Sequence, residues 1–400
     1  MHTLPLEEVV AAHQTGPDGL RPLSKIISTI SPVVVRQNTP AGPKYQEALG
    51  YTFLLNSPKY PGLCKMDDGT LVLTLTAALS GEIVTNDNGA QLVDETKRTD
   101  VILFSRDNGL SWSQPLRIPG YRTTPMYLGG NRLMLRGWLD WIDTAENFCF
   151  WFSEDGGQTW SEPEKVPALP DGRAVNTDVA PNMLIEGDTV RFVFYIDGGD
   201  GRFRTEAIIW PYNHVAHQFT EPWFFPQAWM ESARCSEGSL TRAANGDLVA
   251  CFRSHRPGIP SPFDGWRGIV TTYSSDDGKT WSEPAVHSLY GHVHHSLLPF
   301  SDGRVLMTYA VRLGELDGRN YHGHDAVLSH DNGRTWDWTR RFILFRGGAD
   351  YSQHSPRSVM LDDGSVLTVF MHPVSYSWAD EDTRGNLIGI SNVSVIIWQT

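Results

Sequence analysis

The chain has 400 residues, a formal net charge of −13 and a hydrophobic content of 40%. The acidic balance disfavours a nucleic-acid-binding protein, because neutralising phosphates requires a basic face, and no apolar run reaches the roughly 18 residues of a membrane helix. The four cysteines show neither CxxC pairing nor metal-ligand spacing, and residues 1–16 lack the charged-then-apolar pattern of a signal peptide. We therefore expect a cytoplasmic globular protein with no metal and no cofactor.

Strand-like apolar runs joined by short turns follow one another along the whole chain. The first run is IISTISPVVVRQ at residues 26–37, and the first clear hairpin is CKMDDGTLVLTL at 64–75, with Asp68-Gly69 in its turn. Asp–Gly and Gly–Asn pairs favour the positive φ angles that tight hairpins need. Such turns recur every 57 to 61 residues, at Gly69, Gly130, Gly187, Gly246, Gly303 and Gly364.

Six units of similar length, each opening with a hairpin, predict an all-β fold, a six-bladed β-propeller. We expect a single domain over 1–400, with 1–25 as an N-terminal extension and blades starting near 58, 121, 178, 235, 293 and 353. The last unit shows only three strand candidates. The N-terminal run 26–37 is therefore expected to supply its outer strand and close the ring.

Four of the six units carry an octapeptide after their third strand. It reads S-x-D-x-G-x-[ST]-W and occurs at 105–112, 153–160, 274–281 and 329–336. The aspartate can accept hydrogen bonds from N–H groups of its own turn, the glycine can adopt a left-handed conformation, and the tryptophan can pack between sheets. This octapeptide motif is interpreted as part of the scaffold and not as a catalytic motif.

Strand direction brings another set of residues to one face of the ring, near its axis. They lie just before the first strand or just after the second strand of a blade. The strand-end residues are Arg136, Arg253, Arg312 and His372, and the strand-start residues are Asp178, Glu237, His294, His295 and His354. Arginine binds carboxylates through a bidentate fork, so this set predicts a site for an anionic, hydroxyl-rich ligand.

The four octapeptides, in register with six hairpins from about residue 30 to the C-terminus, resemble the Asp-box (BNR) repeats of the sialidase superfamily. The resemblance implies a six-bladed propeller with a pocket at its axis and, often, hydrolysis of terminal acidic sugars. Sialidases hold the substrate carboxylate with three arginines. They use a tyrosine nucleophile activated by a glutamate, and an aspartate as acid/base.

The best match to that pattern is EGSLTRAANGDLVACFR, in which Glu237 precedes Arg253 by sixteen positions. The resemblance implies that Glu237 activates the nucleophile and that Arg253 binds the carboxylate. Arg312 would be a second clamp, and Arg36 lies where the first sialidase arginine is sought, without its usual R-I-P context.

The remaining catalytic positions depart from the family pattern. Ser355 stands where the family tyrosine is expected, and Tyr351, four residues earlier, is the candidate nucleophile. Glu82 and Asp87 are acid/base candidates after the second strand of the first blade, but neither lies in a recognisable motif.

The histidines suggest a different chemistry at the same face. His294, His295 and His354 can serve as acid/base groups near neutral pH, as in propeller lyases and unusual glycosidases that act on uronic acids. The run His322-Gly323-His324-Asp325 can either ligate a metal or form ordinary loop hydrogen bonds.

Five tryptophans are predicted in loops of this face, where they can stack on sugar rings or pack blade edges. They are Trp138, Trp141, Trp229, Trp266 and Trp378.

Three functions remain open from these observations. The first is an exo-acting glycoside hydrolase of sialidase type that cleaves a terminal acidic sugar. The second is a histidine-dependent lyase or glycosidase acting on uronic-acid glycans, and the third is a non-catalytic glycan-binding propeller. In each case the expected partner is an anionic carbohydrate, not a nucleic acid or a membrane, and the oligomeric state is open.

Overall fold

The chain is described from a computed structural model that covers sixteen segments. They are residues 29–30, 33–38, 56–78, 84–85, 91–94, 98–140, 145–177, 183–197, 204–226, 236–255, 267–287, 291–316, 319–346, 354–373, 387–389 and 391–400. For the residues at the ends of some segments, and for β1, β2, β5, β6 and β28, only the backbone is described.

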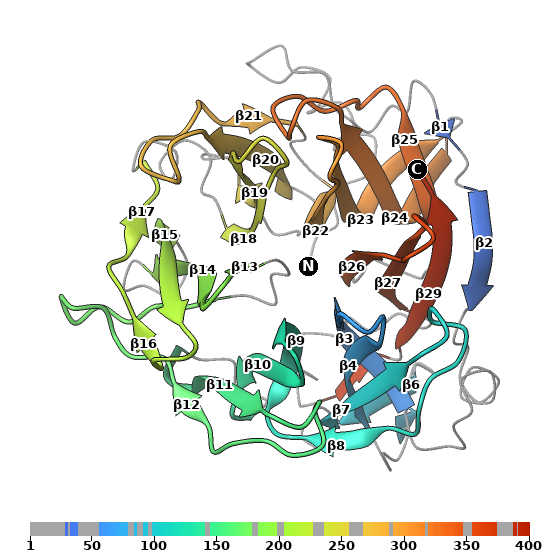
Figure 1. Cartoon of the computed structure of the whole chain (residues 1–400). Helices are drawn as coiled ribbons and strands as arrows, with labels where there is room; N and C mark the ends of the chain where they lie inside the picture. The colour runs from blue at the N-terminus through green and yellow to red at the C-terminus, as the bar shows by residue number, and fades with distance from the viewer. Residues whose placement is uncertain are drawn as a thin grey trace.

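The described residues form an all-β, six-bladed propeller, as the recurring hairpins predict. Within them a single short 3-10 helix, η2 (Ala145–Asn147), stands beside 29 strands, and none of the described helices is long and apolar enough to cross a membrane. In each blade the strands of one repeat unit pair antiparallel and run outward in chain order, with the innermost strand nearest the centre of the ring (Figure 1). Blades 5 and 6 each gain one more outer strand from the N-terminal part of the chain, parallel in blade 5 and antiparallel in blade 6.

The strands of the first three blades, from the innermost outward, have the following bounds. Blade 1 contains β3 (Asn56–Lys65), β4 (Leu71–Ala78), β7 (Arg98–Ser105) and β8 (Leu116–Ile118). Blade 2 contains β9 (Tyr121–Gly129), β10 (Arg132–Trp138), β11 (Phe148–Ser153) and β12 (Glu164–Lys165). Blade 3 contains β13 (Leu184–Glu186), β14 (Thr189–Asp197), β15 (Arg204–Asn213), β16 (Gln218–Phe219) and β17 (Trp223–Phe224).

The other three blades follow the same order. Blade 4 contains β18 (Ser236–Arg242), β19 (Leu248–His255), β20 (Arg267–Ser274) and β21 (Ala285–Val286). Blade 5 contains β22 (His292–Pro299), β23 (Val305–Leu316), β24 (Arg319–Ser329) and β25 (Arg341–Arg346), with β1 (Thr29–Ile30) parallel to β25. Blade 6 contains β26 (His354–Met360), β27 (Val366–Pro373), β29 (Ser391–Gln399) and β2 (Val33–Asn38), and a small sheet joins β5 (Val84–Thr85), β6 (Gln91–Asp94) and β28 (Leu387–Gly389).

The N-terminal strand β2 pairs antiparallel with β29 as the outermost strand of blade 6. This is the pairing that the missing fourth strand of the last unit predicts. Closure of the ring by this strand stays a prediction.

The turn glycines adopt the backbone conformation that their sequence context predicts. All six have positive φ, from 56° at Gly187 to 92° at Gly303. An L-side chain disfavours this region, which is why each hairpin turn carries a glycine there.

The octapeptide motif forms the same hydrogen-bonded turn in all four blades, between the third and fourth strands. In blade 5, Ser329 Oγ donates to Asp331 Oδ1 at 2.8 Å and accepts from Gly333 N at 2.8 Å. Asp331 also accepts from the backbone N and the hydroxyl of Thr335, at 2.8 and 2.6 Å. Because the carboxylate of the aspartate accepts its hydrogen bonds from its own turn, the motif is structural.

The apolar core is a ring of six clusters, one between each pair of neighbouring blades. The octapeptide tryptophans all belong to these clusters: Trp112 between blades 6 and 1, Trp160 between 1 and 2, Trp281 between 3 and 4, and Trp336 between 4 and 5. Each blade is therefore held mainly by its two neighbours, and the innermost strands are fixed around the axis.

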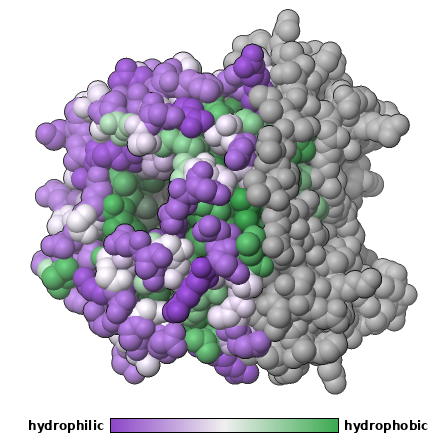
Figure 2. Space-filling view, turned by 45° about the vertical axis from the view of Figure 1, so that its right-hand side comes forward, coloured by the Kyte–Doolittle hydropathy of each residue, from purple (hydrophilic) through white to green (hydrophobic). Residues whose placement is uncertain are grey.

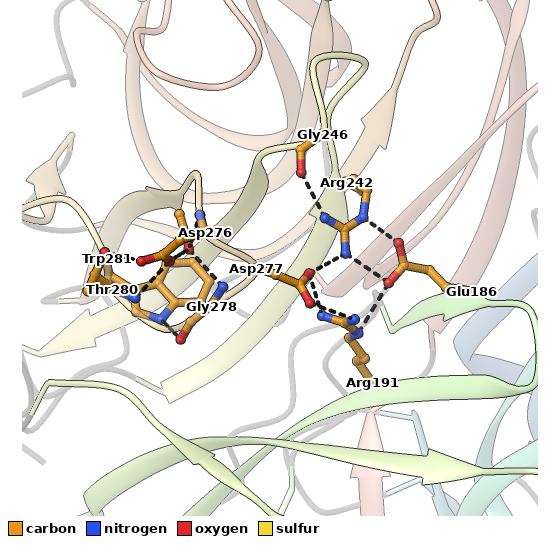
Figure 3. A network of polar contacts seen from close by, with 10 residues as sticks. Glu186, Arg191, Arg242, Gly246, Asp276, Asp277, Gly278, Thr280 and Trp281 are labelled. Atoms are coloured by element: carbon orange, nitrogen blue, oxygen red, sulfur yellow. Dashed lines mark hydrogen bonds and ion pairs between the residues drawn. The ribbon is translucent and has the colours of Figure 1, made fainter.

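Blade 3 lacks the octapeptide, and an ionic cluster joins it to blade 4 (Figure 3). Glu186 and Arg191 of blade 3 contact Arg242 and Asp277 of blade 4, with Arg191 Nη1 2.9 Å and Arg242 Nη2 2.7 Å from Asp277 Oδ1. Partly exposed pairs of this kind contribute little free energy individually, but a four-member network fixes the register between two blades.

The surface visible in Figure 2 is mostly hydrophilic where it is described, with a hollow whose walls carry hydrophobic residues.

Candidate active site

The innermost strand of five blades begins with a β-bulge, in which two residues face one residue of the second strand. In blade 4, for example, Glu237 and Gly238 together face Phe252. The bulged pairs are Tyr60 and Pro61, Arg122 and Thr123, Glu237 and Gly238, His294 and His295, and Ser355 and Pro356. Bulges bend a strand and re-aim its side chains, so the same device is repeated around the axis.

The first residue of four of these bulges has a left-handed backbone. The φ angles are 50° at Tyr60, 52° at Arg122, 47° at Glu237 and 52° at His294. A non-glycine residue there costs about 1 kcal/mol and persists where its surroundings over-determine it, commonly at ligand sites. Four such residues at one register indicate a functional site. We call the bulged starts of the innermost strands, together with the side chains that contact them, the rim.

Glu237 and Arg253 form a buried ion pair at this rim. Arg253 Nη1 donates to Glu237 Oε1, and the two side chains are only 7% and 3% exposed. Arg253 lies near the end of β19 and pairs through its backbone with Ser236, so the strand-start and strand-end positions meet as the strand directions predict.

His294 extends this pair to blade 5. Its Nδ1 lies 3.5 Å from Glu237 Oε2, and its Nε2 lies 2.8 Å from Arg312 Nη2. A guanidinium can only donate, so Nε2 accepts and Nδ1 carries the hydrogen that faces the carboxylate. The result is a continuous chain from Arg253 through Glu237 and His294 to Arg312, built across two blades.

Further guanidinium groups are buried beside this chain. Arg136 of β10 is 2% exposed and Arg357 of β26 is 3% exposed. Burial, followed by the nearby charge of Arg136, lowers the pKa of Arg357 well below its usual range. Two guanidinium groups are thus held close together out of water.

Buried polar groups of the preceding blade hold three of the bulges in place. The Tyr195 hydroxyl of blade 3 accepts from Gly238 N, and Ser239 Oγ of blade 4 donates to the His295 carbonyl at 3.0 Å. Asp100 of blade 1 accepts from Thr123 N at 2.6 Å, and burial raises the pKa of Asp100 to about 6 against the effect of its hydrogen bonds. Hydrogen bonds from neighbouring blades thus fix the backbone at three of the five bulges.

Several of the predicted site residues lie outside the described part of the chain. The backbones of Arg36, His354 and His372 are described but not their side chains, and Asp178, Tyr351, Glu82 and Asp87 are not described. The structure thus brings together Glu237, Arg253, His294 and Arg312. His295 lies close enough to these groups for the charges of Glu237, Arg253 and Arg357 to influence its pKa.

The prediction of Trp138 as a loop residue is wrong. It ends strand β10, is 1% exposed and packs edge-on against Phe148, with ring centroids 5.4 Å apart, in the cluster between blades 2 and 3. Trp141, Trp229, Trp266 and Trp378 lie outside the described residues.

The His322–Asp325 run lies on β24 and not in a loop. His324 Nε2 bonds the Met371 carbonyl at 2.9 Å, and Asp325 lies 3.7 Å from Arg341. His324 and Asp325 thus have separate protein partners. Within the described segments, no three His, Cys, Asp or Glu side chains are grouped to hold a metal.

The strand-end rule overlooked Tyr60, Arg122 and Arg357. The number of residues between each bulge and the turn glycine of its own blade is a signal that could have found them. The first bulge residue precedes that glycine by nine positions for Tyr60, Glu237, His294 and Ser355, and by eight for Arg122. Counting nine back from Gly187 reaches Asp178, which is outside the described residues.

The neutral form of His295 makes the rim sensitive to acid. The residue is fully buried, its Nδ1 lies 3.1 Å from Ser239 Oγ, and burial lowers its pKa to about 3 from the usual 6.5. The unfolded chain binds a proton at this residue below pH 6.5 while the folded protein does not, so stability falls as pH falls through this window. We expect a contribution of up to about 2 kcal/mol between pH 6.5 and 5.

Thermal unfolding of the wild type and His295→Asn at pH 6.5 and pH 5 checks this expectation. The difference between the two proteins isolates His295 from His287, which acts in the same direction, and from Asp100, which acts in the opposite one. Parallel losses of stability in the two proteins would show that His295 does not contribute.

Comparison with known proteins supports this reading of the fold. The family model of the BNR repeat-like domain matches residues 135–366, more than half of the chain. A sequence comparison with curated proteins finds no match.

Solved structures with the same fold include three that span most of this chain. A protein of unknown function from Dyadobacter fermentans is 18% identical, covers 92% of this chain and 98% of its own, and has a TM-score of 0.62. An α-L-arabinanase from Penicillium chrysogenum in complex with arabinobiose is 12% identical, with coverages of 92% and 98% and a TM-score of 0.57.

A sialidase from Streptococcus pneumoniae is also 12% identical, with coverages of 87% and 69% and a TM-score of 0.55. At such identities the likeness shows the fold and does not transfer an activity. On the six-bladed fold and the matched family model, the chain belongs to the BNR repeat-like domain family.

Proposed function

We propose that this protein is an exo-acting glycoside hydrolase that cleaves a terminal acidic sugar from a glycan. The observation that carries the proposal is the chain of contacts in which Glu237 is held between Arg253 and His294, with Arg312 at its end. A preorganised, buried carboxylate among guanidinium groups combines a general base with a carboxylate-binding site.

The arginines account for the acidic character of the proposed sugar. Arg253 and Arg312 come from the ends of second strands, and Arg136 and Arg357 are buried beside them. A planar guanidinium matches a carboxylate in a bidentate fashion and loses little hydration energy on burial compared with lysine.

Glu237 is proposed to take the proton of the attacking hydroxyl. Arg253 keeps the carboxylate ionised, and the Nδ1 hydrogen of His294 orients its second oxygen. The hydroxyl oxygen then bonds to the anomeric carbon, the glycosidic C–O bond breaks, and the leaving oxygen takes a proton from an acid. In a second step a water molecule attacks the same carbon and gives a proton to the group that acted as the acid. The bond to the enzyme oxygen breaks, and that oxygen recovers its proton from Glu237. Tyr351 as nucleophile, and Glu82 or Asp87 as acid, stay predictions.

Structures with the same fold give this proposal its chemical context. The pneumococcal protein is a sialidase and the Penicillium protein an α-L-arabinanase, so this architecture supports glycoside hydrolysis. Recognition of an acidic sugar rests on this chain's own arginines.

A lyase acting on uronic-acid glycans is the second candidate, and His294 is the observation that favours it. Release of the Arg312 contact would free His294 Nε2 to act as a base beside a guanidinium that can neutralise a uronate carboxylate. In that reaction a proton leaves the carbon next to the carboxylate, and the glycosidic oxygen leaves as a double bond forms. The released product is then unsaturated.

Turnover of acidic glycans by matched variants tests the proposal. We expect Glu237→Gln to lower kcat/KM by about 10²-fold, because the amide cannot accept the proton. Glu154→Gln is the control, since Glu154 is 70% exposed and pairs with Arg132 away from the rim. An active Glu237→Gln variant would remove Glu237 from the chemistry, and equal losses in both variants would point to a general folding effect.

A further inference from the structure

Tyr195, on β14 of blade 3, contacts the backbone beside Glu237. Its hydroxyl accepts a hydrogen bond from Gly238 N, in the second residue of the bulge that begins β18. Tyr195, Glu237 and Gly238 are all buried, so bulk water does not take the place of this acceptor. The bond holds the peptide group between Glu237 and Gly238, and with it the direction in which the bulge aims the Glu237 side chain.

Packing against the same strand leaves no space for a side chain at position 238. A Cβ on Gly238 would lie 2.6 Å from Val193 Cγ1 and 2.8 Å from Phe252 Cε1. Val193 lies two residues before Tyr195 on β14, so both side chains are on the same face of the strand. Strand β14 thus holds the bulge in two ways, by close packing through Val193 and by a hydrogen bond through Tyr195.

The backbone of Tyr195 is itself held on both sides. It pairs with Ala207 of β15, and it forms an isolated bridge with Asn176, in which each N–H bonds the carbonyl of the other residue at 2.8 Å. The ring is completely buried in the apolar cluster between blades 3 and 4. Close packing on a doubly paired strand fixes the hydroxyl in one place, which a mobile surface group would not do.

The left-handed backbone of Glu237 needs support of this kind. Its φ of 47° is unfavourable for a residue with a side chain, and it persists where the surroundings over-determine it. Blade 2 meets the same need with Asp100, which accepts from Thr123 N at 2.6 Å. Beside Glu237 a second buried carboxylate would oppose ionisation of the first, whereas a phenol accepts the bond without a charge.

We propose that Tyr195 is a positioning residue for the reaction: its hydroxyl holds the Glu237–Gly238 peptide group and thereby keeps the Glu237 carboxylate where it accepts the proton. The role requires no contact between Tyr195 and the substrate, because it acts through the backbone of β18. The kinetic part of this inference rests on the proposed function of Glu237, whereas the hold on Gly238 does not.

Amide hydrogen exchange in the whole protein tests the contact without any substrate. Tyr195→Phe removes the hydroxyl and keeps the buried ring, so we expect the Gly238 amide to exchange about tenfold faster than in the wild type. Mass spectrometry with electron-transfer fragmentation resolves this single amide. Tyr212→Phe is the matched control, because Tyr212 is also completely buried in blade 3, and its hydroxyl donates at 2.7 Å to Glu164 of blade 2, on the other side from blade 4.

Steady-state kinetics show whether the contact matters for the reaction. The probes are glycans ending in sialic, ketodeoxynonulosonic, ketodeoxyoctulosonic or uronic acid, and the one that the wild type cleaves fastest is used. We expect Tyr195→Phe to lower kcat about tenfold and to leave KM within about twofold, because a displaced base weakens the transition state and not substrate binding. Tyr212→Phe should change neither constant, whereas a general loss of folding would lower the activity of both variants.

Unchanged exchange at Gly238 in Tyr195→Phe would overturn the proposal, and so would equal acceleration in Tyr195→Phe and Tyr212→Phe. Faster exchange with an unchanged kcat would also overturn it, because Glu237 would then not depend on this contact. If the wild type cleaves none of these glycans, the hydrolase function fails and the kinetic part of this proposal fails with it. Exchange at Gly238 still shows in that case whether Tyr195 holds the bulge, so the two failures are distinguishable.

Discussion

Arg253→Met is expected to lower the free energy of unfolding by about 3–5 kcal/mol, because it leaves the buried Glu237 carboxylate without its guanidinium partner. Both side chains are less than a tenth exposed, so water cannot replace the lost contact. Urea unfolding followed by tryptophan fluorescence measures the change.

A double-mutant cycle shows whether this loss comes from the pair. Glu237→Gln combined with Arg253→Met removes both charges, so the double variant should be more stable than Arg253→Met alone, even though it carries one more substitution. Strictly additive losses would mean that Glu237 and Arg253 are not energetically coupled. That result would also weaken the role of Arg253 in holding Glu237 ionised.

Gly333→Ala is expected to destabilise the protein by about 2–5 kcal/mol, because it meets two obstacles at once. Gly333 belongs to the octapeptide of blade 5 and has a φ of 82°, which an alanine side chain disfavours. A Cβ at this position would lie 2.6 Å from Val249 Cγ2 of blade 4, so the two blades would have to move apart.

Gly364→Ala is the matched control, because Gly364 has the same backbone conformation as Gly333 but is not packed against another blade. Its φ is 80°, and no heavy atom lies within 4 Å of the position of a Cβ. It should cost only the conformational part, about 1–2 kcal/mol, in the same urea experiment. Equal costs for the two variants would show that the octapeptide glycine does not need to be small for blades 4 and 5 to pack.

The fold was predictable because its determinants are local and repeated. Each hairpin needs a residue of positive φ, and Gly69 through Gly364 provide one at a nearly constant interval. Each octapeptide closes its own hydrogen-bonded turn, as Asp331 does, so the pattern is visible without any long-range contact. These local patterns can therefore be recognised in the sequence before the arrangement of the blades is known.

The sequence predicted the site residues only where the ends of adjacent strands bring the side chains together. Glu237 and Arg253 meet because their strands are adjacent in chain and in space, and spacing alone reveals this. Tyr60 and Arg122 depend on a bulge, whose presence is not encoded by residue type. Trp138 was placed wrongly because a strand end and the start of a loop carry the same short-range signal, and only packing against Phe148 separates them.

The mass of the product released by the wild type tests the central claim most directly. Glycans ending in sialic, ketodeoxynonulosonic, ketodeoxyoctulosonic or uronic acids are incubated with the protein, and the products are identified by mass spectrometry. The Glu237–Arg253–His294–Arg312 site predicts a free acidic monosaccharide, formed by the addition of one water molecule across the cleaved glycosidic bond. A product lighter by one water would contradict hydrolysis, and ultraviolet absorbance of an unsaturated sugar in that product would assign the site to the lyase reaction. Tight binding of these glycans without any product would contradict catalysis.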